Sequence, residues 1–142
     1  MNALLTTALL ALIAADDNAV KKDLKLLEGD WVVTKLEYSG NDITERYPLR
    51  FVIKGSEIAI EGDAGVKKEY GRFAIKIDPS TSPRCIDIKV TLGVQKDVTM
   101  EGIYDVKKDE LRLCVKVLGN DRPTEFKNGD EIALVTLKRK DK

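Results

Sequence analysis

The chain of 142 residues contains no histidine, and this limits the chemistry that its other side chains can do. Histidine is the commonest general base near neutral pH and the commonest metal ligand in proteins. Mechanisms of the Ser-His-Asp or Cys-His type are excluded, since each needs an imidazole. We therefore expect a domain that is not an enzyme. The exception to consider is chemistry by a tyrosine or a carboxylate inside the fold.

Several polar or soft side chains fall in the middle of segments that have a strand pattern. There they could orient a ligand by a few polar contacts in an apolar cavity. Arg112 is a weaker candidate, because it alternates with Leu111 and Leu113, which we expect to face inward. The competing interpretation is a small barrel that its own side chains fill. The candidate ligand-binding residues are Tyr70, Arg72, Met100, Tyr104 and Phe126.

The cysteines and carboxylates do not predict a metal or redox site, and no cofactor is expected. Cys85 and Cys114 fall in the outward phase of two strands that are separated by a third. Their Cα atoms should then lie about 9–10 Å apart, at about 4.8 Å per strand. A disulfide needs a separation within about 7 Å, so we expect no bond. Neither Asn120-Asp121 nor Asn128-Gly129-Asp130 has the spacing of an EF-hand loop.

The charges balance, with 24 Lys and Arg against 24 Asp and Glu. A general nucleic-acid binder would show a basic excess, so no nucleic-acid partner is predicted. The basic tail at residues 138–142 is typical of a solvated terminus. The partners that remain open are a small hydrophobic ligand and a protein of the cell envelope.

Residues 3–15 are almost wholly apolar, and Asp16-Asp17-Asn18 ends the run abruptly. The run has the length of a secretory signal core and is too short to span a bilayer. We therefore expect residues 1–15 to be a signal peptide and residues 16–142 to be one exported domain, periplasmic or extracellular, with no transmembrane segment after cleavage. The alternative is an N-terminal helix packed on the domain, since no Lys or Arg precedes the apolar run.

The remaining sequence changes from a helical to a strand pattern at Trp31. Asn18 is a plausible N-cap, and residues 19–27 have one apolar helical face. The following segments alternate with a period of two, and no helical pattern is long enough for a parallel crossover. We expect an all-β, antiparallel up-and-down barrel of about eight strands with the short helix across one end; a two-sheet sandwich is the rival. The expected strands are 31–38, 49–54, 57–61, 68–77, 84–92, 98–106, 110–117 and 131–139.

Residues 118–130 form the longest irregular stretch and contain Arg122-Pro123-Thr124-Glu125-Phe126. Proline fixes φ, Phe126 can dock on the core, and Arg122 or Glu125 can pin the loop by ion pairs or backbone bonds. One interpretation is a rim element over the barrel mouth that contacts a ligand or partner. The other is a loop that folds back and seals one end of the barrel.

Two features, one near each end of the domain's sequence, resemble the lipocalin, or calycin, superfamily. The first is Gly29-Asp30-Trp31 at the first strand, with a helix before it, and the second is Lys138-Arg139 at the end of the last strand. The resemblance implies that a basic side chain, Lys138 or Arg139, packs over the buried Trp31. Such a contact between a cation and an indole contributes about 0.5–2 kcal/mol.

A closer resemblance covers nearly all of the chain after the apolar run. It is to a small uncharacterised domain family of Planctomycetes, usually exported and described as lipocalin-like, whose members often read Leu-Gln-Gly-Thr-Trp where this chain has Leu27-Glu28-Gly29-Asp30-Trp31. That family has no established activity. The resemblance implies an exported barrel that binds a small apolar or amphipathic molecule; the alternative is a cell-envelope interaction module with a filled barrel. The matching segments are 23–31, 102–104, 111–114 and 122–126.

Overall fold

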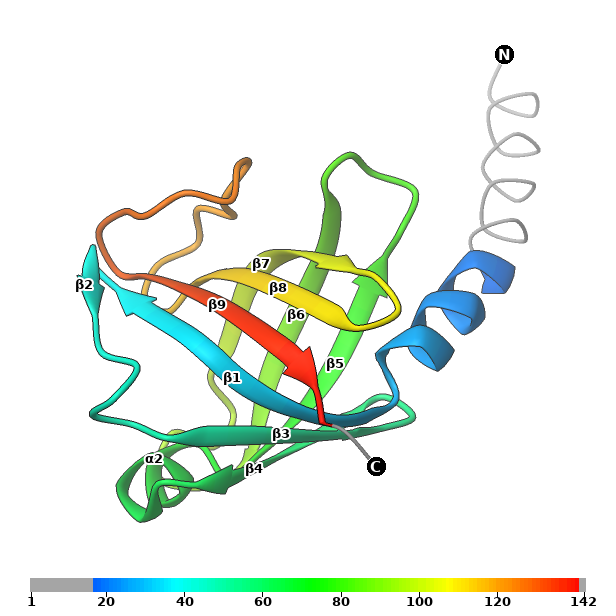
Figure 1. The fold of residues 1–142 in the computed structure, drawn as a ribbon. Helices are drawn as coiled ribbons and strands as arrows, with labels where there is room; N and C mark the ends of the chain where they lie inside the picture. Colours follow the sequence, from blue (N-terminus) through cyan, green and yellow to red (C-terminus); the bar gives the residue numbers. More distant parts are fainter. Residues whose placement is uncertain (1–16, 141–142) are drawn as a thin grey trace.

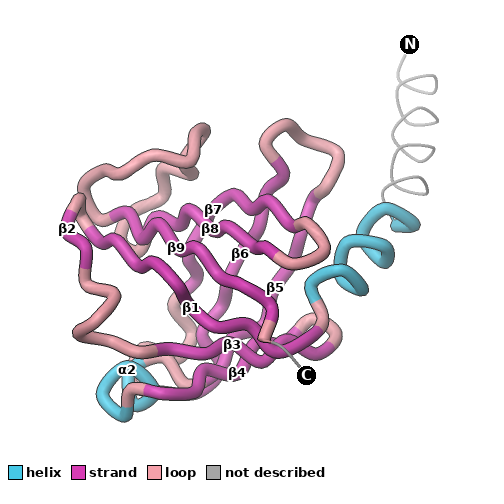
Figure 2. Tube along the Cα trace, viewed as in Figure 1, coloured by secondary structure: helices cyan, strands magenta, loops and turns pink. Residues whose placement is uncertain are grey.

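The structure is a computed structural model that describes residues 17–140, so the expected signal peptide lies outside the described residues. The described part is a sheet wound into a barrel, with a helix at residues 17–27 leading into it (Figure 1). Figure 2 shows how little of the rest is helical. The elements are β1 (Gly29–Tyr38), β2 (Asn41–Asp42), β3 (Leu49–Lys54), β4 (Glu57–Gly62), α2 (Ala64–Glu69), β5 (Arg72–Asp78), β6 (Arg84–Leu92), β7 (Thr99–Val106), β8 (Glu110–Lys116) and β9 (Ile132–Arg139).

The strands pair in chain order from β3 to β9, and β1 closes the ring by pairing with both β3 and β9. All of these pairings are antiparallel, and the two-residue β2 is attached only to the end of β1. The result is an eight-stranded up-and-down barrel without free edges in the ring. The predicted lipocalin-like fold is confirmed, and the rival two-sheet sandwich is wrong.

The two ends of the barrel differ. We call the end where β1 begins and β9 finishes the closed end, because the helix of residues 17–27 packs there. Leu27 and Asp23 of that helix are buried, and Asp23 reaches Tyr104 and Arg84 of the barrel. We call the opposite end, where β1 finishes and β9 begins, the open end.

Trp31 occupies the interior at the closed end and is 0% exposed. Its indole N–H donates to the carbonyl of Leu27 at 2.8 Å, so the buried donor is satisfied. Gly29 is required at the entry to β1, since its φ is +138° and an added Cβ would lie 2.4 Å from Nη1 of Arg139. The sequence prediction for Gly29 and Trp31 therefore agrees with the structure. Trp31 belongs to the hydrophobic core of the barrel, which also includes the buried residues Ile53, Ile86, Leu111 and Leu137.

Arg139, and not Lys138, is the basic residue over Trp31. The guanidinium carbon lies 4.2 Å from the centre of the indole ring. Its nitrogens donate to the carbonyls of Leu26 (2.9 Å), Glu28 (2.7 Å) and Lys108 (2.8 Å). Lys138 is exposed and pairs with Glu110 instead. Arg139 thus ties the end of the helix, the start of β1 and the β7–β8 turn together.

The segment between β4 and β5 differs from the prediction. A turn at 62–65 and a strand over 68–77 were expected, but α2 occupies residues Ala64–Glu69 and β5 begins at Arg72. The Asp63 side chain caps this helix by accepting from the N–H of Val66 at 2.9 Å. Beside α2 the pairing of β4 with β5 is short: the paired residues are 57–59 and 72–74, with one further backbone hydrogen bond on each side of them.

The loop at residues 118–130 lies on the outer wall of the barrel. Arg122 donates to the carbonyls of Ile86 and Gly102 and also pairs with Asp87 and Glu101, so it is pinned to β6 and β7. The loop is folded back, as one of the two interpretations has it. Both predicted positions, over the mouth and across an end, are nevertheless wrong, because this arginine finds its partners on the outside of the sheet.

Cys85 and Cys114 are both free, as expected. They flank Ile103 on the outer face of β6, β7 and β8. The loop covers Cys114, whose Sγ lies 3.4 Å from the carbonyl oxygen of Glu125. Burial raises the pKa of the Cys114 thiol, which makes it a poor nucleophile. No helix among residues 17–140 combines the length and apolarity needed to cross a membrane.

A candidate ligand-binding cavity at the open end

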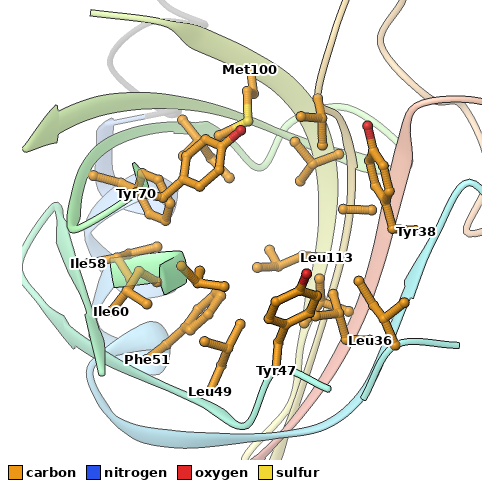
Figure 3. A pocket seen from close by; sticks show the side chains of 18 residues that line it. Leu36, Tyr38, Tyr47, Leu49, Phe51, Ile58, Ile60, Tyr70, Met100 and Leu113 are labelled. Atoms are coloured by element: carbon orange, nitrogen blue, oxygen red, sulfur yellow. The ribbon is translucent and has the colours of Figure 1, made fainter. Parts of the chain in front are cut away.

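The open half of the barrel contains a cavity of about 360 Å³. Its wall comes from most strands of the ring, from α2 and from the segment between β2 and β3 (Figure 3). The lining residues are Leu36, Tyr38, Ile43, Tyr47, Leu49, Phe51, Ile58, Ile60, Val66, Tyr70, Phe73, Ile88, Met100, Leu113, Val115, Val117, Ala133 and Val135.

The floor of the cavity separates it from the packed closed end. Ile58, Ile60 and Leu113 are at most 3% exposed. Phe51 also lines the cavity, and in the β1–β3 ladder it lies opposite Trp31. The interior is therefore filled by its own side chains around the tryptophan and hollow beyond the phenylalanine. The sequence left two alternatives open, a barrel filled by its own side chains and a barrel with a ligand cavity. The first describes the closed half, and the second describes the open half.

Three of the lining residues are tyrosines, and the rest are apolar. Tyr38 is the last residue of β1, Tyr47 precedes β3, and Tyr70 follows α2, so all three stand at the open end. Figure 3 shows them on different sides of the cavity. All three are partly exposed, unlike the buried floor. The mouth is thus the only part of the lining that offers hydroxyl groups within the described residues.

The three hydroxyls are not equivalent. Tyr38 donates its hydroxyl proton to the carboxylate of Glu131, and this hydrogen bond, together with burial, raises the pKa of Tyr38 to about 12. Burial raises the pKa of Tyr70, and the neighbouring Glu69 carboxylate adds to the effect. Within residues 17–140 the hydroxyls of Tyr47 and Tyr70 have no hydrogen-bond partner of their own. These two hydroxyls are therefore available to a bound molecule.

Of the five predicted ligand residues, the structure brings Tyr70 and Met100 together in the cavity wall. Arg72 is exposed on the outside of β5. Phe126 lies outside the barrel, with the Arg112 guanidinium 4.3 Å from its ring centre. Arg112 is thus exterior, as its phase in the sequence predicted.

Tyr104 points inward, but at the closed end. Its hydroxyl donates to the buried Asp23 carboxylate at 2.7 Å, and burial together with that bond raises the pKa of Tyr104. Arg84 contacts both, at 3.0 Å from Asp23 and 5.1 Å from the Tyr104 ring centre. This cluster joins the helix to the barrel and does not line the cavity.

Tyr38, Tyr47 and the residues of the floor were not among the ligand-binding residues predicted from the sequence. A signal for the tyrosines was present: Tyr38 precedes the Ser39-Gly40 turn, and Tyr47 precedes Pro48 and the next strand. Residues at the ends of consecutive antiparallel strands that meet at one rim are close in space. No comparable signal exists for the floor, because its residues have the same pattern as any strand that faces a core.

No buried carboxylate of residues 17–140 lines the cavity. Asp23 is the buried carboxylate of the described residues, and it is engaged by Tyr104 and Arg84 away from the cavity. No group of three or more potential metal ligands occurs in the part of the chain that the structure describes.

Comparisons with protein-family models, curated proteins and solved structures find no match to this chain. The predicted relation to the Planctomycetes family therefore stays a prediction.

Proposed function

We propose that this barrel is a non-enzymatic binding domain for one small apolar or amphipathic molecule in its open half. The observation that carries the proposal is the cavity of about 360 Å³ with an apolar wall. Ligand pockets in proteins commonly measure about 300–1,000 Å³. At about 30 Å³ for each water-sized group, the cavity accommodates about twelve non-hydrogen atoms.

The lining favours an apolar body with a polar group at one end. Burial of apolar surface contributes about 25 cal/mol per Å², so a chain or ring in this cavity gains affinity from its whole length. Tyr47 and Tyr70 can orient a polar group at the mouth, because their hydroxyls have no partner among the described residues. The floor offers no polar group, so the apolar end of the ligand points toward Trp31.

The ionisable groups of the cavity favour binding over catalysis. A general base near neutral pH needs a pKa close to that pH. The pKa values of Tyr38 and Tyr70 are raised from an ordinary value of about 10, so both hydroxyls stay protonated. Neither takes up a proton at neutral pH: Tyr38 donates to Glu131, and Tyr70 can donate to or accept from a bound molecule.

A matched pair of substitutions tests the proposal. Ala133 lines the cavity, whereas Ala74 faces outward from β5. Isothermal titration with 1-decanol should show binding to the unaltered domain, at least tenfold weaker binding to Ala133→Phe, and unchanged binding to Ala74→Phe. Absence of binding to the unaltered domain by decyl ligands with any head group, or equal affinities for both variants, would overturn the proposal.

We further propose that the domain acts outside the cytoplasm, on the basis of the apolar run at residues 3–15. N-terminal sequencing of the protein recovered from cells is the test: a mature chain that begins near residue 16 supports export, and a chain that retains residues 1–15 contradicts it. The alternative of a cell-envelope interaction module assumed a filled barrel, and the hollow open half does not favour that version.

A further inference from the structure

We infer that the ligand has an uncharged or cationic polar head and that the site rejects carboxylates. This inference rests on the proposed function and specifies the chemical class of its ligand. It rests on two observations about the mouth. The residues that line the cavity offer hydroxyl groups there but no cation, and the charged groups that act on these hydroxyls are carboxylates.

The first observation is that none of the 18 residues that line the cavity is charged. A carboxylate that leaves water needs a counter-ion or several hydrogen-bond donors, and without them its transfer is strongly unfavourable. Lys67 of α2 is a cation of the same end of the barrel, but it pairs with Glu61 at 3.1 Å and does not line the cavity. A fatty acid carboxylate would therefore find no partner of opposite charge in the lining.

The second observation is that carboxylates flank two of the three mouth tyrosines. Glu131 accepts the hydroxyl proton of Tyr38, which occupies that donor. Glu69 ends α2 beside Tyr70, where its carboxylate accepts from the Gln95 side chain at 3.2 Å and raises the Tyr70 pKa through its negative charge. An anionic head at the mouth would approach both negative charges, and such like-charge contacts weaken binding and suppress wrong partners.

A neutral or cationic head group finds hydrogen-bond partners at the mouth and is not repelled by its carboxylates. An alcohol can donate to and accept from the free hydroxyls of Tyr47 and Tyr70. An ammonium group can donate to the same oxygens and is attracted by the carboxylates of Glu131 and Glu69. The apolar wall contacts the chain in the same way whichever head it carries, so the head group alone should decide the difference in affinity.

Three ligands with the same chain separate these cases: 1-decanol, decylamine and decanoate. At about pH 8 the amine is protonated and the acid is ionised. Isothermal titration of the full domain should give a Kd for decanoate at least tenfold higher than that for 1-decanol, with decylamine equal to or tighter than the alcohol. Decanoate that binds as tightly as 1-decanol would overturn the inference and leave the proposed function standing. Failure of all three ligands would overturn the proposed function itself.

Two glutamate variants show whether the mouth charge is responsible. Glu131→Gln keeps an acceptor for the Tyr38 hydroxyl but removes the charge, so the ratio of the decanoate Kd to the 1-decanol Kd should fall by about threefold or more. Glu37→Gln is the matched control. Glu37 pairs with Lys35 at 3.4 Å and with Asn128, and it does not line the cavity. The control should leave the ratio unchanged, and an equal fall in both variants would contradict the assignment to Glu131.

Discussion

Replacement of Arg139 by methionine is the sharpest test of how the closed end is held. Methionine keeps an unbranched apolar chain over the Trp31 ring but has no guanidinium. The variant loses the donors to the carbonyls of Leu26, Glu28 and Lys108, and the cation that lies 4.2 Å from the indole centre. The carbonyls of Leu26 and Glu28 lie where the helix ends and β1 begins, and there the guanidinium supplies their hydrogen bonds.

The size of the loss follows from these contacts. Hydrogen bonds from charged donors contribute about 1.5–3 kcal/mol each, but these carbonyls are exposed enough to regain water, so we take about 1 kcal/mol for each of the three. A cation over an indole at an exposed site adds about 0.5–1 kcal/mol. Arg139→Met should therefore lower the free energy of unfolding by about 3.5–4 kcal/mol, a large share of the roughly 5–15 kcal/mol of a typical domain.

Urea unfolding followed by Trp31 fluorescence and by circular dichroism measures this loss. With an m-value of about 1–3 kcal/mol/M, the midpoint should fall by about 1–4 M at unchanged m. Lys138→Met is the matched control: its exposed pair with Glu110 should contribute less than about 1 kcal/mol. If the free energies of unfolding of Arg139→Met and Lys138→Met differ by less than about 0.5 kcal/mol, Arg139 does not hold the closed end together as described.

Three further predictions concern other parts of the barrel. Arg84→Met should leave the buried carboxylate of the N-terminal helix without its counter-ion, lower the free energy of unfolding by about 3 kcal/mol, and make the amides of residues 19–27 exchange faster. Arg122→Met should release the loop at 118–130 and increase the rate of Cys114 labelling by a thiol reagent by about tenfold or more. In an ultraviolet titration of the tyrosines, Tyr38→Phe should remove one group that titrates at about pH 12. The pKa of Tyr38 in the folded state lies above its unfolded value of about 10. The hydrogen bond to Glu131 therefore stabilises the fold below about pH 10, and this stabilisation is lost as the pH rises through about 12.

The closed end could be predicted from the sequence because its residue types have few structural alternatives. A glycine two positions before a lone tryptophan predicted a turn into the first strand, and Gly29 has a φ that other residues rarely adopt. The alternating segments predicted inward positions such as Leu111 and Leu113, because the side-chain period of a strand is two. The choice between Lys138 and Arg139 needed coordinates, since it depends on the exact phase at which β9 meets β1.

The open end could not be predicted in the same way. Helix α2 has six residues, one of them a glycine, and its main signal was the Asp63 cap, which also fits a turn. The position of the 118–130 loop depends on where Arg122 finds two carboxylates and two carbonyls, which lie on strands far away in sequence. Whether the barrel is hollow depends on summed side-chain volumes across the ring, and the inward pattern of Ile58 and Ile60 is the same in either case.

The hollow half has a cost in stability, and that cost bears on function. Empty apolar cavities in protein cores forgo about 24 cal/mol per Å³, so a fully dry cavity of about 360 Å³ would correspond to as much as about 9 kcal/mol of lost packing. Larger side chains at positions such as Ala133 would recover part of this. Ala133→Phe should therefore keep or raise the free energy of unfolding while it blocks 1-decanol. Opposite signs for stability and affinity are what a stability–activity trade-off predicts, because the side chain that packs the cavity better removes the space for the ligand.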